Sequence, residues 1–412
     1  MNARAVGLVA LAALAACGGP PTPLQPAPAR DTVPIPLPRP APAPPVTPPP
    51  ARIHAPVRVT FVGDINLGTL SLPDGVPPDS GRGLLDAARP ALRGDLVVGN
   101  FEGVLGDSAV TTKCGTKPRQ VGFQAVKDSV AHPPIPRRPH RKPPKEKAPK
   151  GPGCYAFLTP TGLAPRLVEA GFTHLNLANN HANDFGAAGR ATTDSVFHEL
   201  GITLYGPLGS IAIDSVRKGS GLTVVGLIGF TTYPFAYDLL DVERSAAVVD
   251  SIRPLVDLLL VTFHGGAEGI AALHTPDGAD SLGHEQRGEL RRWARAVIEA
   301  GADAVVGHGP HVPRGIEFYR GVPIVYSLGN FLTYSGFNLS GPLGLTGVLQ
   351  LDFSAGQRLD GARLIPMVQR RLRGPSPDPT GATLRLVRRL SAEDFLVTGA
   401  VISGDGTISA DP

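Results

Sequence analysis

Five runs of the sequence place metal-competent or acid–base side chains directly after an apolar stretch that is typical of a buried strand. In chain order they are VTFVGDINLG, DLVVGNFEG, LNLANNHANDFG, LLLVTFHGGAE and ADAVVGHGPH. Each run alone is weak evidence, because Asn and Asp are common turn formers after a strand. Loops of neighbouring strands meet at the carboxyl edge of an α/β sheet, so five such runs predict one shared polar site. Its candidate residues are Asp64, Asn100, Glu102, Asn180, His181, His264, His308 and His311.

The residue types in this set indicate which cation the site would take. Imidazole nitrogens combined with carboxylate and amide oxygens suit Mn²⁺, Zn²⁺ or Fe, whereas an all-oxygen set would favour Mg²⁺ or Ca²⁺. No thiolate belongs to the set, which excludes a cysteine-type structural zinc. His308 and His311 lie in a Gly/Pro turn that would let both rings face the same metal, one or two ions being possible. With His181 as proton donor beside Asn180, the set suits metal-assisted hydrolysis of a phosphoester or similar bond.

Strands and helices alternate through the part of the chain that carries these runs, which predicts an α/β fold. The expected strands are 57–63, 95–99, 172–178, 222–229, 257–263, 303–307 and 322–328. The expected helices are 83–92, 161–170, 187–200 and 284–300. After about Gly344 short β-like runs follow, with no helix expected before SAEDF at 391–395. We therefore expect a main domain over residues 57–355 and a β-rich extension over 356–412.

The N-terminal residues predict export and a membrane anchor. Residues 1–17 combine a short basic start, an apolar run and the sequence LAAC, which resembles a lipoprotein signal with its lipobox. Cys17 would then carry the lipid and anchor the protein to a membrane without spanning it. The alternative is a generic apolar leader with an incidental Cys. Residues 18–56 are mostly Pro and Ala, typical of a disordered linker, and Gly18 favours outer-membrane sorting in a Gram-negative cell.

Two cysteines remain, Cys114 and Cys154, and they flank a basic loop inserted over residues 115–153. In an exported protein this even pair predicts a disulfide, with free buried thiols as the alternative. The stretch RRPHRKPPKEKAPK carries seven Lys or Arg and a single Glu, while the whole chain has a net charge of +4. It is either a solvated spacer or a weak site for an anionic polymer, with Arg137, Arg138, Arg141 and Lys142 as contacts. No nucleic-acid partner is expected.

The ordered motifs GDINLG, GNFEG, NLANNHANDFG, HGGAE and GHGPHVPRGIEFYRGVPIVYSLGNFL resemble the poly-γ-glutamate capsule synthesis family called CapA. That family has a fold related to calcineurin-like metallophosphoesterases, and the resemblance covers about residues 57–335. It implies a four-layer sandwich of two mixed β-sheets flanked by helices, with the site at one edge.

The resemblance also implies roles for single residues. Asp64, Asn180, His264 and His308 or His311 match metal-ligand positions, and His181 matches the proton donor. Glu102, with Asn100, stands where the relatives have a bridging carboxylate. The chain departs from the pattern at Asn66, where those enzymes have a histidine. The first metal site has therefore lost its imidazole or takes it from elsewhere.

Two classes of function follow as expectations. One is an envelope protein of the capsule or poly-γ-glutamate type with a metal-dependent hydrolase site. The other is a non-catalytic, metal-containing component that binds or exports an anionic polymer. The basic loop favours polymer binding, whereas the pairing of Asn180 with His181 favours catalysis.

Overall fold

The computed structural model describes residues 53–108, 112–115 and 154–411. The predicted lipidation site Cys17, almost all of the predicted linker and the basic-loop residues Arg137, Arg138, Arg141 and Lys142 lie outside these ranges. Within them, no helix combines the length and the apolar character that crossing a bilayer requires.

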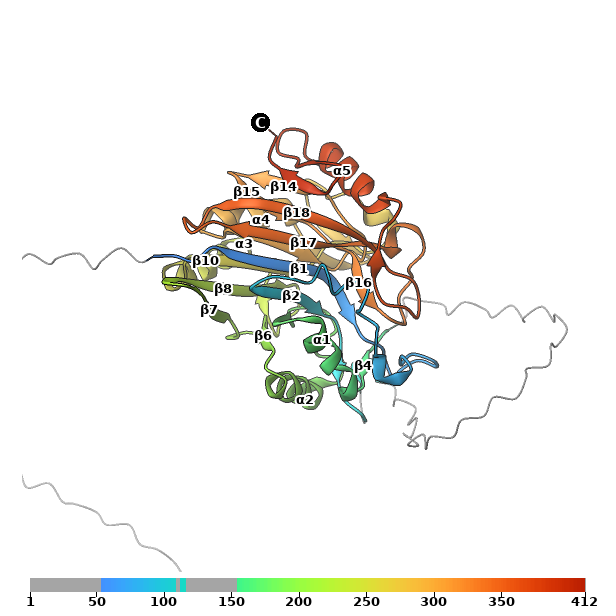
Figure 1. The fold of residues 1–412 in the computed structure, drawn as a ribbon. Coiled ribbons are helices and arrows are strands. Elements are labelled where there is room, and N and C mark those ends of the chain that lie inside the picture. The colour runs from blue at the N-terminus through green and yellow to red at the C-terminus, as the bar shows by residue number, and fades with distance from the viewer. Residues whose placement is uncertain (1–52, 109–111, 116–153, 412) are drawn as a thin grey trace, which may run out of the picture. The chain divides into compact units, whose positions relative to one another are not determined.

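The first of two large mixed sheets has ten strands, in the main order β20-β21-β18-β17-β1-β2-β5-β6 (Figure 1). Strands β1, β2, β5 and β6 run parallel, while β17, β18 and β21 continue the sheet antiparallel. Two further strands, β16 and β19, pair with β1 and β18. The bounds are β1 Val57–Asn66, β2 Leu96–Phe101, β5 His174–Asn176, β6 Thr203–Tyr205, β16 Asn330–Thr333, β17 Leu345–Phe353, β18 Leu359–Val368, β19 Ser376–Pro377, β20 Val401–Ile402 and β21 Thr407–Ser409.

The second sheet has seven strands in the order β14-β15-β13-β10-β8-β7, with β9 paired to β8. Its central strands β8, β10, β13 and β15 are parallel. The bounds are β7 Ala212–Lys218, β8 Gly221–Thr231, β9 Tyr237–Asp238, β10 Leu258–His264, β13 Ala304–His308, β14 Ile316–Tyr319 and β15 Val322–Val325. Two small pairs complete the described strands: β3 Val104–Leu105 with β4 Leu158–Thr159, and β11 Asp280–Leu282 with β12 Glu285–Gly288.

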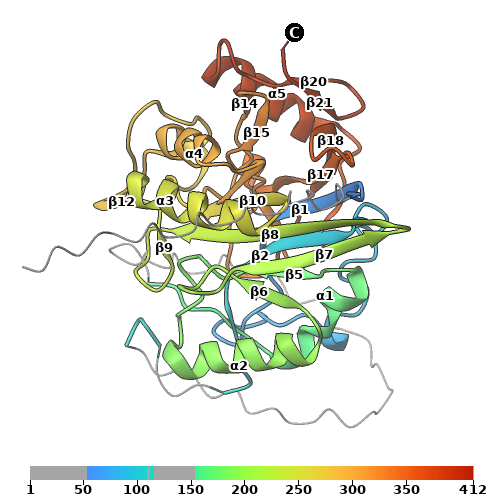
Figure 2. The same cartoon turned by 90° about the vertical axis from the view of Figure 1, so that its left-hand side faces the viewer.

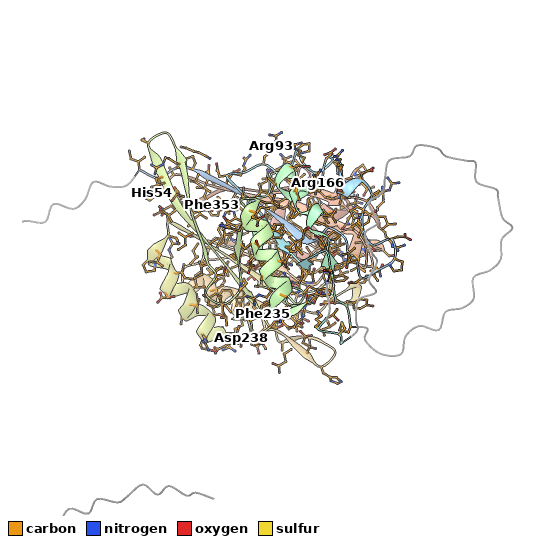
Figure 3. The ribbon with its side chains drawn as sticks, turned by 90° about the horizontal axis from the view of Figure 1, so that it is seen from below. His54, Arg93, Arg166, Phe235, Asp238 and Phe353 are labelled. Atoms are coloured by element: carbon orange, nitrogen blue, oxygen red, sulfur yellow. A yellow bond between two sulfur atoms is a disulfide. The ribbon has the colours of Figure 1, made fainter. Side chains whose placement is uncertain are left out.

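Helices cover the outer face of each sheet, so the expected four-layer sandwich is present (Figure 2). Helices α1 Pro165–Ala170 and α2 Gly186–Glu199 pack on the ten-stranded sheet, and Figure 3 views the molecule from the side of α2. Helices α3 Val242–Ile252 and α4 Leu290–Glu299 pack on the seven-stranded sheet. A core of aliphatic side chains lies between the sheets, and α5 Ala382–Asp394 adds Leu384 and Val387 to it.

The sequence of β1 explains why its side chains reach both faces of the sheet and why the strand ends in polar residues. Val57, Val59 and Phe61 alternate onto the face between the sheets, as the period of a strand requires. Val62 and Ile65 face the helix-covered side instead. The pairing of β1 with β2 shifts register between Phe61 and Asp64, and such an irregularity re-aims the side chains that follow it.

Several sequence predictions of secondary structure were wrong. Residues 83–92 form consecutive turns with mostly i to i+3 hydrogen bonds instead of a helix, because Pro90 has no amide hydrogen to donate. Helix α4 begins only at Leu290, since residues 285–288 pair with 280–282 as β12. Helices α3 and α5 were not predicted, and α5 begins at Ala382, before the expected SAEDF.

Candidate metal centre

Two pairs of predicted site residues lie side by side on neighbouring strands. Asp64 of β1 is in register with Asn100 of β2, and His264 of β10 is in register with His308 of β13. Glu102 follows β2 directly, and its backbone N–H donates to the carbonyl of Ile65 at 2.8 Å. Since β1 and β2 belong to one sheet and β10 and β13 to the other, the site joins the carboxyl ends of both sheets.

The carboxylate of Asp64 is the meeting point of the cluster. Its Oδ2 lies 3.0 Å from Nδ1 of His311, and its Oδ1 lies 3.4 Å from Nδ1 of His308. Asn100 donates to the same Oδ1 at 2.9 Å. Burial alone would raise the pKa of Asp64, but the close contacts and charges of the two imidazoles outweigh it and hold that pKa well below its usual range. Both rings of the Gly/Pro turn thus contact one carboxylate, through different oxygens.

The turn that carries His311 needs unusual backbone conformations. Gly309 has φ 112°, and a Cβ there would lie 2.7 Å from the carbonyl oxygen of Gly265. His311 itself has φ 59°, a costly value for a residue with a side chain. Its carbonyl accepts a hydrogen bond from Nδ2 of Asn330 at 3.1 Å, which helps to hold the conformation. Residues held in this way against strain cluster at functional sites.

Glu102 is the strongest sign that a cation belongs here. The residue is fully buried, and neither carboxylate oxygen has a hydrogen-bond partner. Its Oε1 lies 3.6 Å from Nε2 of His311 and 3.8 Å from Nε2 of His264. Burial raises the pKa of Glu102 well above its usual value, although His311 opposes the shift. Buried carboxylates are normally hydrogen-bonded, ion-paired or bound to a metal.

Other buried nitrogen and oxygen atoms that could bind a metal also lack hydrogen bonds. They are Nε2 of His264 and Nδ1 of His308, and Oδ1 of Asn180, in the turn after β5, lacks a hydrogen bond as well. One donor atom each from Asp64, Glu102 and His311 lie within 4.8 Å of one another. Burial would lower the pKa of His311, but Glu102, Asp64 and Glu268 outweigh this effect and raise it to about 10. This nitrogen and oxygen donor set fits a borderline divalent cation.

Asn100 was predicted as a metal ligand, and in the structure its side chain is hydrogen-bonded to neighbouring residues through both oxygen and nitrogen. Its Oδ1 accepts hydrogen bonds from Nδ2 of Asn176 and of Asn179, both at 3.1 Å. Backbone contacts fix how those two amides are turned, since Ala178 N–H donates to Asn176 and Asn179 donates to the carbonyl of Phe101. Asn100 therefore turns its nitrogen toward Asp64 and His264, so it orients them and offers no ligand oxygen.

Asn66, where the sequence departs from the metallophosphoesterase pattern, is a backbone anchor. Its Nδ2 donates to the carbonyl of Glu102 at 2.9 Å, and its Oδ1 accepts from the N–H of Gly68 at 3.2 Å. The imidazole that contacts Asp64 comes instead from His311, far along the chain. The sequence left two alternatives open, and the contact between His311 and Asp64 is what an imidazole taken from elsewhere would require.

The predicted proton donor lies in the turn after β5. His181 is buried, with Nδ1 2.8 Å from Oδ2 of Asp184 and the ring of Phe157 at 4.5 Å between centroids. Burial lowers the pKa of His181, and Asp184 opposes the shift. Asp184 orients the ring, an arrangement that general acid–base catalysis uses to position a proton donor or acceptor.

Glu268 was not among the predicted ligands, and the structure brings it to the cluster. Its Oε2 lies 3.9 Å from Nε2 of His311, and its Oε1 lies 3.0 Å from Nη2 of the fully buried Arg287. Glu268 belongs to the quoted run HGGAE, but only the position of Arg287, on β12, gives it a fixed orientation. No signal in the sequence linked those two residues.

The disulfide between Cys114 and Cys154 is present, with the two Cα atoms 5.7 Å apart. This confirms the predicted pairing, and free thiols were the wrong alternative.

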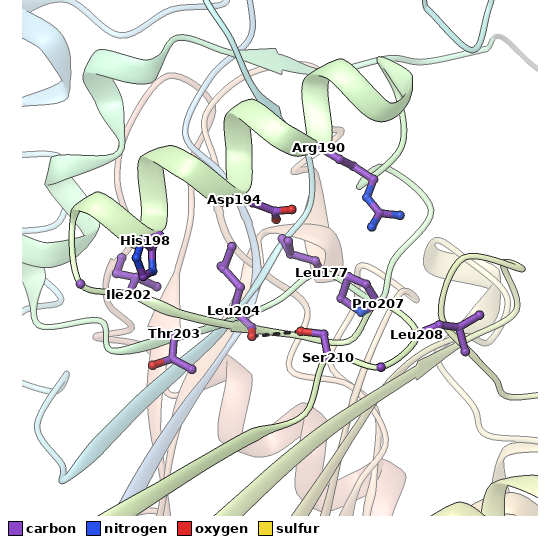
Figure 4. Close-up of a pocket in the computed structure, with 12 residues that line it drawn as sticks. Leu177, Arg190, Asp194, His198, Ile202, Thr203, Leu204, Pro207, Leu208 and Ser210 are labelled. Atoms are coloured by element: carbon purple, nitrogen blue, oxygen red, sulfur yellow. Dashed lines mark hydrogen bonds between the residues drawn. The ribbon is translucent and has the colours of Figure 1, made fainter.

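A separate cavity of about 780 Å³ lies between α2 and the segment that connects β6 to β7 (Figure 4). Arg190, Asp194 and His198 line it from the helix, and the loop 207–210 lines it from the other side. None of the residues of the metal cluster contributes to its wall. The groups with the strongest capacity for chemistry are therefore in the buried cluster and not in this cavity.

Residues 142–335 match the family described as "Bacterial capsule synthesis protein PGA_cap". The chain is 32% identical over 185 residues to the PGA biosynthesis protein CapA of Bacillus subtilis (strain 168), covering 42% of this chain and 45% of that protein. It is 29% identical over 244 residues to the capsule biosynthesis protein CapA of Bacillus anthracis, covering 55% of this chain and 54% of that protein. The chain thus spans about half the length of these relatives.

Solved structures with a similar arrangement include a putative 5′-nucleotidase from Staphylococcus aureus, at 12% identity and TM-score 0.38, covering 82% of this chain and 59% of that one. Another is a 5′-nucleotidase precursor from Thermus thermophilus, at 14% identity and TM-score 0.38, covering 83% of this chain and 60% of that one. At these identities and TM-scores no functional conclusion follows from the likeness.

Proposed function

We propose that this chain, in which residues 142–335 match the PGA_cap family and which is similar to CapA proteins, is a cell-envelope lipoprotein of the capsule or poly-γ-glutamate type with a metal-dependent hydrolase site. The observation that carries the hydrolase part is the buried carboxylate of Glu102, whose oxygens have no hydrogen-bond partner although other ligand-type side chains surround it. The oriented His181 in the turn after Asn180 is the second support.

Asp64, Glu102, His311, His264, His308 and Asn180 would hold one or two ions of Mn²⁺, Zn²⁺ or Fe. When bound, such an ion would lower the pKa of a water ligand and stabilise negative charge on the substrate. Asn100 would keep Asp64 and His264 in place through its amide nitrogen. In its protonated form, His181 would donate the proton on Nε2 to the leaving-group oxygen, while its Nδ1–H stays hydrogen-bonded to Asp184.

Substitutions separate these roles. In the protein loaded with Mn²⁺ or Zn²⁺, His181→Ala should lower turnover of a generic phosphodiester by about 10²- to 10⁴-fold and leave the metal content unchanged. His264→Ala and His308→Ala should lose metal as well as activity. His198→Ala is the matched control, because this exposed histidine on α2 lies outside the cluster. No turnover by the metal-loaded wild-type protein on phosphodiesters or on envelope polymers would contradict the proposal.

A non-catalytic role in binding or exporting an anionic polymer is the second candidate, favoured by the basic stretch 137–150. Affinity for poly-γ-glutamate should then fall steeply with salt, since charge attraction between exposed groups is screened over about 8 Å at physiological ionic strength. Deleting residues 137–150 should weaken that affinity. The non-catalytic role is favoured if His181→Ala restores capsule to a deletion strain as well as the wild-type protein does.

The anchor is tested by fractionation. The wild-type protein should be found in the detergent-soluble membrane fraction with lipid on Cys17, because the apolar leader ends there. Unchanged membrane association and unchanged processed size in Cys17→Ala would refute the lipid anchor.

A further inference from the structure

Asp184 is fully buried, and three different segments hold its carboxylate. Oδ1 pairs with Nζ of Lys113 at 2.6 Å. Oδ2 accepts the N–H of Phe157 at 2.7 Å and lies 2.8 Å from Nδ1 of His181. The orientation of the His181 ring therefore depends on where Lys113 and Phe157 lie.

Lys113 makes more than one contact with the turn that carries His181. Its backbone N–H donates to the carbonyl of Asp184 at 2.8 Å, and its Nζ donates to the carbonyl of Asn180 at 3.0 Å. One lysine thus bonds to both ends of the turn 180–184. The side chain is 34% exposed, while that of Asp184 is 0% exposed, so the ion pair is partly shielded from solvent. Shielding of this kind strengthens a charge pair relative to one on the open surface.

The disulfide joins the two segments that hold Asp184. Lys113 precedes Cys114 directly, and Phe157 follows Cys154 by three residues. Cys114 and Cys154 are 40 residues apart in the sequence. Without the bridge, the segment of Lys113 and the segment of Phe157 would be linked covalently only through that long connection. Closing a loop of this length removes many conformations from the open chain.

We propose that the Cys114–Cys154 disulfide sets the orientation of His181 by fixing Lys113 and Phe157 against Asp184, and that Lys113 is a positioning residue of the site. Lys113 acts through Asp184 and through its own contact with the ring, since its Nζ lies 3.5 Å from Nδ1 of His181. The effect of Lys113 on turnover rests on the proposed hydrolase function, whereas its effect on the His181 ring and on the turn does not.

The test compares four variants of the full-length chain made in an oxidising compartment. Lys113→Met removes the cation, Lys113→Arg retains it, and Cys114→Ser with Cys154→Ser removes the bridge. Lys218→Met is the matched control, because Nζ of Lys218 also pairs with an aspartate, Asp95, at 2.7 Å. Hydrogen exchange of the peptide that covers residues 179–186 and the ¹⁵N signals of the His181 ring are the readouts that need no activity.

In Lys113→Met and in the double serine variant, exchange at 179–186 should rise several-fold and the His181 signals should shift, since the turn opens locally more often. Lys113→Arg should restore most of the wild-type pattern, and exchange in β10 should stay unchanged in every variant. If the protein turns over a phosphodiester, kcat should fall about 10- to 100-fold with KM nearly constant, as for other partners that orient a functional side chain.

Wild-type exchange at 179–186 together with wild-type His181 signals in Lys113→Met would overturn the positioning role. The same result in the double serine variant would overturn the role of the disulfide. If neither the wild type nor any variant turns over a phosphodiester, while the exchange and signal changes are present, only the hydrolase function is refuted.

Discussion

Glu102 and Glu317 are both fully buried glutamates, and their surroundings predict opposite results for the same substitution. Neither oxygen of Glu102 has a hydrogen-bond partner. Glu317 is fully satisfied, since Nε of Arg295 donates at 3.0 Å, the hydroxyl of Tyr326 at 2.8 Å and that of Thr398 at 2.9 Å. Replacing each carboxylate by an amide of similar shape therefore tests whether the Glu102 carboxylate serves to bind a cation.

In the presence of a chelator, and at a pH high enough to ionise Glu102, Glu102→Gln should raise the free energy of unfolding by about 1–2 kcal/mol, because a buried acceptor without a hydrogen bond costs more when it is charged than when it is neutral. Glu317→Gln should lower it by about 2–4 kcal/mol, because a charge-assisted hydrogen bond to a guanidinium is lost. At about 2–4 °C per kcal/mol, both shifts would be visible in the melting temperature.

Urea unfolding with chelator and then with Mn²⁺ gives the measurement. At a metal concentration about 100 times its Kd, the wild-type protein and Glu317→Gln should each gain about 2.7 kcal/mol. Glu102→Gln should lose most of that gain. The reasoning fails if Mn²⁺ and Zn²⁺ stabilise Glu102→Gln as much as the wild-type protein, or if this variant is less stable than the wild type under chelator.

Three other predictions follow from single sites. Asn66→His should lower stability by about 1–2 kcal/mol without strengthening Mn²⁺ binding, because the turn after β13 already supplies the imidazole. Burial lowers the pKa of His174, so the folded protein binds this proton more weakly than the unfolded chain; stability should fall below about pH 6.5, and less so in His174→Gln. Gly63→Ala would place a Cβ 1.9 Å from the carbonyl oxygen of Gly329, so urea unfolding should show a loss of about 1–3 kcal/mol or more, whereas Gly162→Ala, with nothing within 4 Å, should cost little.

The sequence predicted that the residues of the cluster lie together, because each of them stands at or just after the end of an apolar run. Asp64, His264 and His308 could be placed from apolar runs alone, since the carboxyl ends of parallel strands converge. The roles of Asn66 and Asn100 could not be predicted in this way. An amide can offer either oxygen or nitrogen, and which one faces the site depends on distant contacts, here the carbonyl of Glu102 and the amide of Asn176.

The errors in secondary structure have similar causes. The helical pattern over 284–300 did not reveal the strand β12. Residues 285–288 form a strand because they pair with 280–282, and their own composition does not indicate it. In the run 83–92 the apolar spacing favours a helix, but Pro90 outweighs it. The contact between Lys113 and Asp184 joins segments about 70 residues apart, and their spacing in the sequence does not predict it.

The position of the cluster across two sheets has a consequence for assembly. Asp64 and Glu102 come from the ten-stranded sheet, while His264, His308 and His311 come from the seven-stranded sheet and its loops. A cation held by this set would link the two sheets of the sandwich. All of its ligands would be in place only after the two sheets have packed together. Uptake of metal would therefore report the last stage of folding, and a half-folded chain would remain without metal.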